Sequence, residues 1–201
     1  MLINRMIQQL KRRNKSDFLR KVIFYFKENV FTLTLIRKLR AWFYFKNGKV
    51  IIGKGVRLKG LPYNIQVGDD TNFYDGSICI VGNEDAVLEI GNSCVFSFAV
   101  LIACTNKIEI GSEVLVGEYT SIRDTTHSYK PLGKSIKSNG DISSPIKIGN
   151  DVWIGRGCII MPGSVIGDGV IIGANSIVKG TLESYSVYAG APLKFIISRK
   201  G

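Results

Sequence analysis

A period of six residues is the feature that most restricts how this chain can fold. Aliphatic side chains recur at every sixth position late in the sequence, at Ile148, Ile154, Ile160, Ile166, Ile172 and Val178. An amphipathic helix repeats near 3.6 residues and a half-buried strand at about 2, so neither element explains a strict six. Short strands that turn at regular intervals do explain it, because each turn stacks its aliphatic side chain on the turn below. Glycine follows the aliphatic residue in four of these six repeats, as expected at corners where backbones approach closely.

The same period extends towards the N-terminus and is then interrupted once for a long stretch. Two earlier sets keep it: Ile90, Phe96 and Ile102, then Ile110, Val116 and Ile122. Looser repeats reach back to about residue 50, and no good repeat lies between Ile122 and Ile148. We therefore predict an all-β solenoid of parallel coils over residues 50–185, with a protruding loop at 128–147.

The repeats resemble those of the hexapeptide-repeat acyltransferases. The run "VWIGRGCIIMPGSVIGDGVIIGANSIV" and the later "YAGAPLKFI" are similar to the branch that acetylates galactosides, maltose and xenobiotics, and the resemblance covers residues 50–197. It implies a left-handed parallel β-helix, although parallel crossovers in general favour the right hand. It further implies a homotrimer that transfers the acetyl group of acetyl-CoA to a sugar or glycan hydroxyl.

His127 is the only histidine of the chain, and it stands where the period stops. Long loops that leave a regular scaffold are often functional. The resemblance implies that neutral His127 is the general base, which deprotonates the acceptor hydroxyl in a direct transfer without an acyl-enzyme. An acceptor must hold its other ring nitrogen. Asp124 is the nearest carboxylate in sequence, and a backbone carbonyl or another carboxylate would serve equally. Ser97 stands where relatives commonly have an asparagine near the acceptor.

The resemblance also implies a set of residues that bind the acyl-CoA. Trp153 matches a tryptophan along the acyl-CoA channel, and Lys194 a basic position near the nucleotide phosphates. Small residues let the pantetheine arm lie close to the coil. Gly180 stands where many relatives have lysine, which leaves Lys179 and Arg156 as further candidates for phosphate contact. The full set is Trp153, Gly155, Arg156, Gly173, Ala174, Lys179 and Lys194.

Positive charge is concentrated at the N-terminus. Residues 1–49 hold 13 basic and 2 acidic side chains, while the remainder is neutral overall. Apolar residues at helical spacing in this segment predict a basic amphipathic helical region. It could cap the open end of the coil stack or contact an anionic membrane through residues 1–45. Its charge-free runs are too short to cross a bilayer, and it has no secretory signal. We expect a cytoplasmic protein, with peripheral membrane contact as an option and no nucleic-acid partner.

The remaining features concern the tail, the cysteines and alternative functions. Pro192 at a first-turn position predicts a short helix in the tail 186–201. Cys94 and Cys158 fall at small inward positions, where thiols are inert. One histidine excludes a zinc site built on several imidazoles, and no metal is expected. Two other functions stay open, namely N-acetylation of an amino sugar nucleotide and a non-catalytic solenoid that binds a partner.

Overall fold

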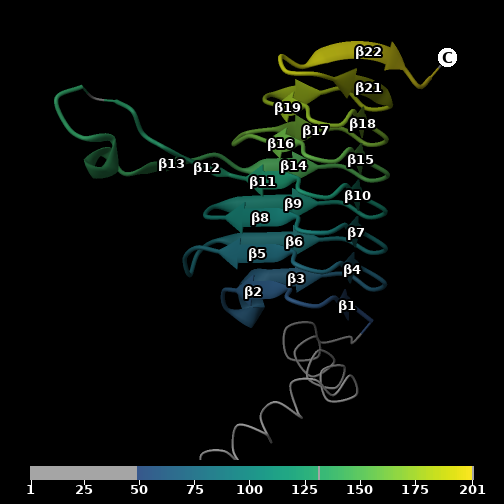
Figure 1. The fold of residues 1–201 in the computed structure, drawn as a ribbon, viewed down its shortest axis with the longest axis horizontal. Coiled ribbons are helices and arrows are strands. Elements are labelled where there is room, and N and C mark those ends of the chain that lie inside the picture. The colour runs from purple at the N-terminus through teal and green to yellow at the C-terminus, as the bar shows by residue number, and fades with distance from the viewer. Residues whose placement is uncertain (1–48, 131, 201) are drawn as a thin grey trace, which may run out of the picture. The chain divides into compact units, whose positions relative to one another are not determined.

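The computed structural model describes residues 49–130 and 132–200, and these form a stack of parallel β-coils (Figure 1). The predictions for residues 1–49, including the cap and the membrane contact, lie outside the described residues except for Lys49. Each coil contributes one strand to each of three parallel sheets, which we call A, B and C. The all-β parallel solenoid is thus confirmed.

The three sheets run the length of the stack, and the chain passes from A to B to C within each coil. Sheet A contains β1 (Ile51–Ile52), β4 (Asn72–Phe73), β7 (Val95–Phe96), β10 (Leu115–Val116), β15 (Trp153–Ile154), β18 (Ile171–Ile172), β21 (Ser186–Ala189) and β22 (Lys194–Ser198). Sheet B contains β2 (Arg57–Lys59), β5 (Ile78–Val81), β8 (Leu101–Cys104), β11 (Ser121–Arg123), β16 (Ile159–Ile160) and β19 (Ile177–Val178). Sheet C contains β3 (Ile65–Val67), β6 (Val87–Ile90), β9 (Lys107–Ile110), β14 (Ile146–Ile148), β17 (Val165–Ile166) and β20 (Thr181–Leu182). A short 3-10 helix, η1 (Pro62–Asn64), precedes β3.

The core consists of aliphatic ladders that the six-residue period brings into register. Ile110, Ile148 and Ile166 face one another on successive strands of sheet C. Ile154 and Ile172 do the same in sheet A. All of these side chains are buried. Burial of this kind contributes roughly 25 cal/mol per Å² of apolar surface, so the ladders are the main stabilising feature of the stack.

Polar side chains tie together the corners that follow sheet C. Asn92 Oδ1 accepts a hydrogen bond from the Asp69 amide at 2.9 Å, and Asn150 Oδ1 accepts one from the Ser112 amide at 2.9 Å. Each corner residue thereby satisfies a backbone N–H of the coil below, which would otherwise lack a partner. Gly111 is required at this corner, because a Cβ there would lie 2.7 Å from Asn150 Oδ1.

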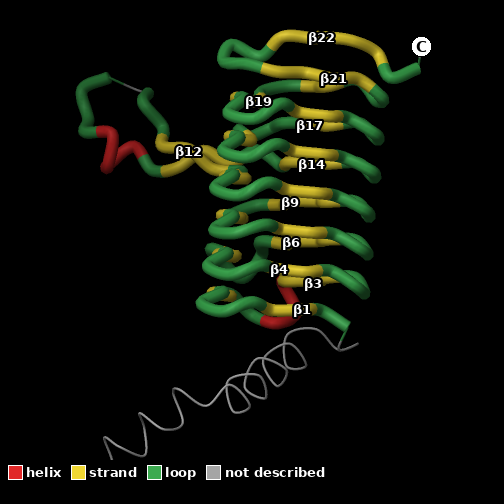
Figure 2. The backbone as a smooth tube through the Cα atoms, turned by 45° about the vertical axis from the view of Figure 1, so that its right-hand side comes forward, coloured by secondary structure: helices red, strands yellow, loops and turns green. Residues whose placement is uncertain are grey.

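Among the residues that the structure describes, the chain leaves the stack between β11 and β14. Strands β12 (Thr125–His127) and β13 (Asp141–Ser143) pair antiparallel, and the short helix η2 (Ile136–Asn139) lies in the segment between them. Figure 2 shows this hairpin projecting from the side of the stack. The loop predicted at 128–147 is therefore a hairpin whose last residues already belong to β13 and β14.

The predicted C-terminal helix is wrong. Lys194–Ser198 form β22, which pairs antiparallel with β21 at the edge of sheet A. Phe195 packs edge-on against Tyr188 with ring centroids 5.7 Å apart. Pairing with the open edge of sheet A satisfies backbone groups of the last parallel strand, and this tertiary gain outweighs local helix preference. No helix long and apolar enough to cross a membrane occurs in residues 49–130 and 132–200.

Candidate functional site

The hairpin places His127 directly opposite Asp141. The two residues are register partners in the β12–β13 pair, and Nδ1 of His127 lies 2.6 Å from Oδ1 of Asp141. Both side chains are largely exposed. An ionised carboxylate can only accept hydrogen bonds, so the contact favours the tautomer in which Nδ1 carries the ring proton and donates a hydrogen bond to Asp141. When such a ring is neutral, its Nε2 is an acceptor, which is the form that a general base requires.

Asp124, the nearest carboxylate in sequence and one of the partners left open for the histidine ring, does not hold it. Its carboxylate is fully buried and accepts hydrogen bonds from the amides of Thr105 at 2.8 Å and Asn106 at 2.7 Å. The Thr125 hydroxyl donates a further bond at 2.9 Å. Asp124 therefore anchors the start of the hairpin to the preceding coil, and this network satisfies a buried charge that would otherwise be costly.

Sequence reasoning missed Asp141, although a usable signal was present. Asp141 is the only carboxylate in the segment 128–147. Its contact with His127 spans 14 residues and depends on the antiparallel return of the hairpin. A search for the nearest carboxylate could not find it, whereas a search across a hairpin that returns to the stack would have done so.

Ser97 lies on the preceding coil, at another corner. It follows β7 between sheets A and B, before β8 begins, whereas His127 lies beyond the C-terminal end of the neighbouring strand β11. Its backbone carbonyl accepts a hydrogen bond from the Ser77 hydroxyl at 3.0 Å. A single chain therefore does not bring Ser97 and His127 together.

Five of the seven predicted acyl-CoA residues gather on neighbouring coils. Trp153 projects from the outer face of sheet A, 53% exposed, in register with Leu115 and Ile171. The corners that follow β15 and β18 carry the other four: Gly155, Arg156, Gly173 and Ala174. Glycine at position 155 is also required by packing, because a Cβ there would lie 2.6 Å from the Ala174 backbone nitrogen.

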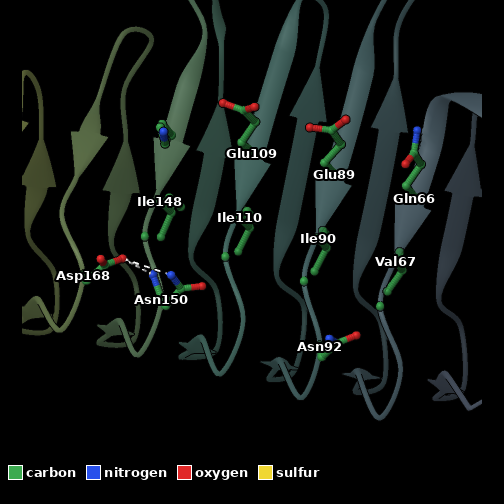
Figure 3. Close-up of a pocket in the computed structure, with 15 residues that line it drawn as sticks. Gln66, Val67, Glu89, Ile90, Asn92, Glu109, Ile110, Ile148, Asn150 and Asp168 are labelled. Carbon is green, nitrogen blue, oxygen red and sulfur yellow. Dashed lines mark hydrogen bonds between the residues drawn. The ribbon is translucent and has the colours of Figure 1, made fainter.

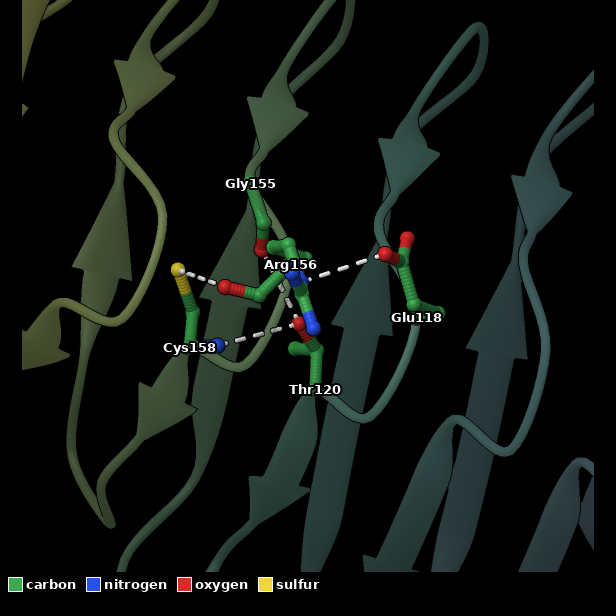
Figure 4. Close-up of polar contacts among 5 residues, drawn as sticks. All are labelled: Glu118, Thr120, Gly155, Arg156 and Cys158. Atoms are coloured by element: carbon green, nitrogen blue, oxygen red, sulfur yellow. Dashed lines mark hydrogen bonds and ion pairs between the residues drawn. The ribbon is translucent and has the colours of Figure 1, made fainter.

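The other two candidate cations lie elsewhere, and Arg156 is already paired. Lys179 follows β19 at the corner between sheets B and C, and Lys194 begins β22 opposite Ala189. Arg156 Nε lies 3.2 Å from Glu118 Oε1, as Figure 4 shows. This ion pair is exposed, so it is weak and can exchange for a phosphate partner.

A buried hydroxyl supports this corner from beneath. Thr120 Oγ1 donates a hydrogen bond to the Gly155 carbonyl at 3.0 Å and accepts one from the Cys158 amide at 3.2 Å (Figure 4). Thr120 is completely buried. It therefore fixes the backbone of the coil that carries Trp153 and Arg156.

The cysteines are unreactive in this environment. Burial raises the pKa of Cys79 to about 12. The pKa of Cys104 is also raised to about 12, by burial and by the nearby charge of Asp124. Burial raises the pKa of Cys94 and Cys158 as well. All four thiols are thus protonated at neutral pH and are poor nucleophiles. Residues 49–130 and 132–200 contain no group of three His, Cys, Asp or Glu side chains suited to a metal ion.

Comparison with known proteins agrees with the repeat and the fold. The family described as bacterial transferase hexapeptide (six repeats) matches residues 145–180. A probable acetyltransferase of Mycobacterium tuberculosis, Rv3034c, is 31% identical over 76% of this chain and 51% of its own length. The galactoside O-acetyltransferase of Escherichia coli is 36% identical over 54% of this chain and 53% of its own. The chain thus spans about half the length of these curated relatives.

Solved structures show the same architecture. The structure of a galactoside acetyltransferase in complex with coenzyme A has a TM-score of 0.57 and 26% sequence identity, covering 90% of this chain and 78% of that one. The stacked coils, the matched repeat and these relatives together show a hexapeptide-repeat protein, whose residues 145–180 belong to the bacterial transferase hexapeptide family.

Proposed function

We propose that this protein is an acetyl-CoA-dependent O-acetyltransferase that acts on a sugar or glycan hydroxyl, with His127 as general base. The observation that carries the proposal is the 2.6 Å contact between His127 Nδ1 and Asp141 Oδ1 on an exposed hairpin. It supports a tautomer that donates from Nδ1 and keeps Nε2 as an acceptor, on a hairpin that projects from the coil stack.

The proposed reaction is a direct transfer. Nε2 of His127 takes the proton from the acceptor hydroxyl while the hydroxyl oxygen attacks the thioester carbonyl of acetyl-CoA. The C–S bond then breaks, and the imidazolium returns the proton to the departing thiolate. Asp141 positions the ring and stabilises the imidazolium by its negative charge. The developing oxyanion needs a hydrogen-bond donor, for which we propose a backbone N–H.

The surface around Trp153 supports the proposal that the protein binds acetyl-CoA, the acetyl donor. The indole, Leu115 and Ile171 form an apolar strip, and Arg156 supplies a positive charge at the adjoining corner. An apolar strip with a nearby cation suits a pantetheine arm that ends in phosphates. The galactoside acetyltransferase that this chain resembles was solved with coenzyme A.

Assembly of several copies would complete the site. Ser97 precedes β8 and His127 follows β11, so the two lie at opposite ends of neighbouring strands of sheet B, and a site that uses both would combine two chains. We propose a homotrimer with its sites between subunits, in the cytoplasm where acetyl-CoA is supplied. Sedimentation of the full chain tests this, and a monomer at working concentration would contradict it.

The basic segment 1–49 motivates a separate proposal, that residues 1–45 bind the protein peripherally to an anionic membrane. Its net charge of +11 equals that of the whole chain. Flotation with vesicles containing anionic lipid should retain the full chain and release a variant without residues 1–45. Equal partitioning of the two would contradict the membrane contact.

An acceptor screen tests the reaction type. The protein is incubated with acetyl-CoA and a panel of mono- and oligosaccharides and amino sugar nucleotides, and products are read by mass shift. We expect acetylation of hydroxyl-bearing sugars that have no free amine. Transfer to amino sugars alone would show N-acetylation instead, and no transfer to any acceptor would favour a binding solenoid.

A further inference from the structure

A long groove runs along the stack where sheet C turns towards sheet A. It has a volume of about 720 Å³ and crosses the coils from Gln66 to Asp168. Figure 3 shows Gln66, Glu89 and Glu109 along one side, and Asn92, Asn150 and Asp168 along the other. None of the residues proposed above for acyl transfer lines this groove.

The groove exists because the six-residue repeat aligns its glycines. Residues without side chains stand in register between the two polar rows, at Gly68, Gly91, Gly111 and Gly149. Their amides already donate to carbonyls of the next coil, for example Gly91 N to Ile110 O at 2.9 Å and Gly111 N to Ile148 O at 2.8 Å. An extended peptide could therefore not bind here by strand pairing, and recognition must come from the side chains.

Each coil contributes one polar side chain to the row that begins at Gln66. Gln66 is the register partner of Glu89, Glu89 of Glu109, and Glu109 of Lys147. Neighbouring strands are spaced about 4.7–4.9 Å apart, which is close to the length of one pyranose unit in an extended chain. A linear glycan that follows the groove would thus meet one polar side chain of this row at each sugar.

The charge of the groove selects the kind of ligand. Three carboxylates line it, Glu89, Glu109 and Asp168, against the single cation Lys147. Lys107 contacts Oε2 of Glu89 and Oε1 of Glu109, at 3.4 and 2.7 Å. A carboxylate has about four lone-pair positions, so both can still accept hydrogen bonds from hydroxyl groups. With Lys107 counted beside Lys147, three carboxylates face two cations, and the remaining negative charge disfavours the phosphates of CoA and acidic polysaccharides.

We propose that this groove binds an uncharged, linear oligosaccharide along the coil axis, with about one sugar for each coil. The proposal rests on the proposed function and extends it, because it assigns the protein a polymeric acceptor. Strand β14, which contributes Lys147 to the groove, follows directly after the hairpin that carries His127. Acceptor chains would then be held on the same coil from which the general base projects.

Calorimetric titration of the full chain without acetyl-CoA tests the groove independently of catalysis. The probes are cello-, malto- and laminari-oligosaccharides of graded length. We expect that in at least one series the dissociation constant falls with each added sugar until the chain spans the rows. Equal affinity for the monosaccharide and the longest chain in every series would overturn the proposal. Tighter binding of an acidic chain of equal length would overturn it too.

Variants locate the binding. Glu89→Ala/Glu109→Ala should weaken binding of the longest chain about tenfold, since two charge-assisted hydrogen bonds are lost. Gln66→Ala removes an exposed side chain and should selectively weaken the longer chains. The matched control, Glu84→Ala/Glu183→Ala, removes two exposed carboxylates outside the groove. Unchanged binding in both groove variants would overturn the proposal.

The outcomes for the groove and for the enzyme can be told apart. Length-dependent binding without acetyl transfer would refute the proposed function and leave the groove. Acetyl transfer without length-dependent binding would refute the groove and leave the function.

Discussion

At the scale of single residues, the two aspartates near His127 have separate tasks. Asp141 contacts the imidazole, whereas Asp124 is buried and holds backbone amides of the preceding coil. Asp141→Asn should lower kcat by about 10- to 100-fold, because the ring loses its charged partner, and it should leave the melting temperature nearly unchanged. Steady-state kinetics and a thermal melt of the same sample check this. Full activity of Asp141→Asn would contradict the positioning role.

The complementary change should act on stability. Asp124→Ala leaves the amides of Thr105 and Asn106 without their acceptor, so it should lower the free energy of unfolding by about 3 kcal/mol. Urea unfolding measures the loss. A stable Asp124→Ala protein with reduced kcat would instead restore Asp124 as a catalytic group.

Thr120 offers a second test of a buried polar group. Thr120→Val keeps the shape but removes the hydroxyl that links the Gly155 carbonyl and the Cys158 amide, and should cost about 1–3 kcal/mol of unfolding free energy. Thr120→Ser retains the hydroxyl and is the matched control. Equal stability of Val and Ser variants in urea would show that the two hydrogen bonds contribute little.

At the scale of elements, the coils depend on close approach at their corners. Gly111→Ala would place a Cβ 2.7 Å from Asn150 Oδ1 and the Gly149 backbone, and should cost about 1–3 kcal/mol through forced displacement. The matched control is Gly82→Ala, whose Cβ would meet its nearest neighbours at an ordinary 3.5 Å. Equal unfolding free energies for the two variants would contradict the stacking argument.

The elements also show which parts of the fold could be predicted from the sequence. The six-residue period correctly predicted the ladder Ile148 to Ile166 and its repetition in sheets A and B, because core stacking alone determines that spacing. The same reasoning missed the His127–Asp141 contact, since the hairpin pairs antiparallel outside the stack. It also assigned Lys194–Ser198 to a helix, because only the open edge of sheet A makes this segment a strand.

At the scale of the whole molecule, one continuous core protects all four cysteines. The raised pKa of Cys79 and Cys104, about 12 for each, keeps these thiols protonated at pH 8. Iodoacetamide at that pH should leave the native protein unmodified and alkylate four thiols after denaturation, as read by mass spectrometry. Rapid labelling of Cys158 in the native protein would contradict its burial and would support a catalytic role for its thiolate.

The arrangement of polar and apolar surface along the stack separates two proposed tasks. Trp153 and Leu115 make the outer face of sheet A apolar, while Glu89, Glu109 and Lys147 make that of sheet C charged. Copies that associate through apolar faces would leave the groove of sheet C open to solvent. The surface proposed for acetyl-CoA and the proposed glycan groove thus lie on different sides of the coil stack.

We propose above that His127 removes the proton from the acceptor hydroxyl. The most direct test is the single-turnover rate of acetyl transfer to an acceptor found in the screen, for wild type and His127→Ala, with acetyl-CoA binding measured alongside. We expect His127→Ala to bind acetyl-CoA normally and to transfer the acetyl group about 10²- to 10⁴-fold more slowly. A His127→Ala protein that transfers at the wild-type rate would contradict it.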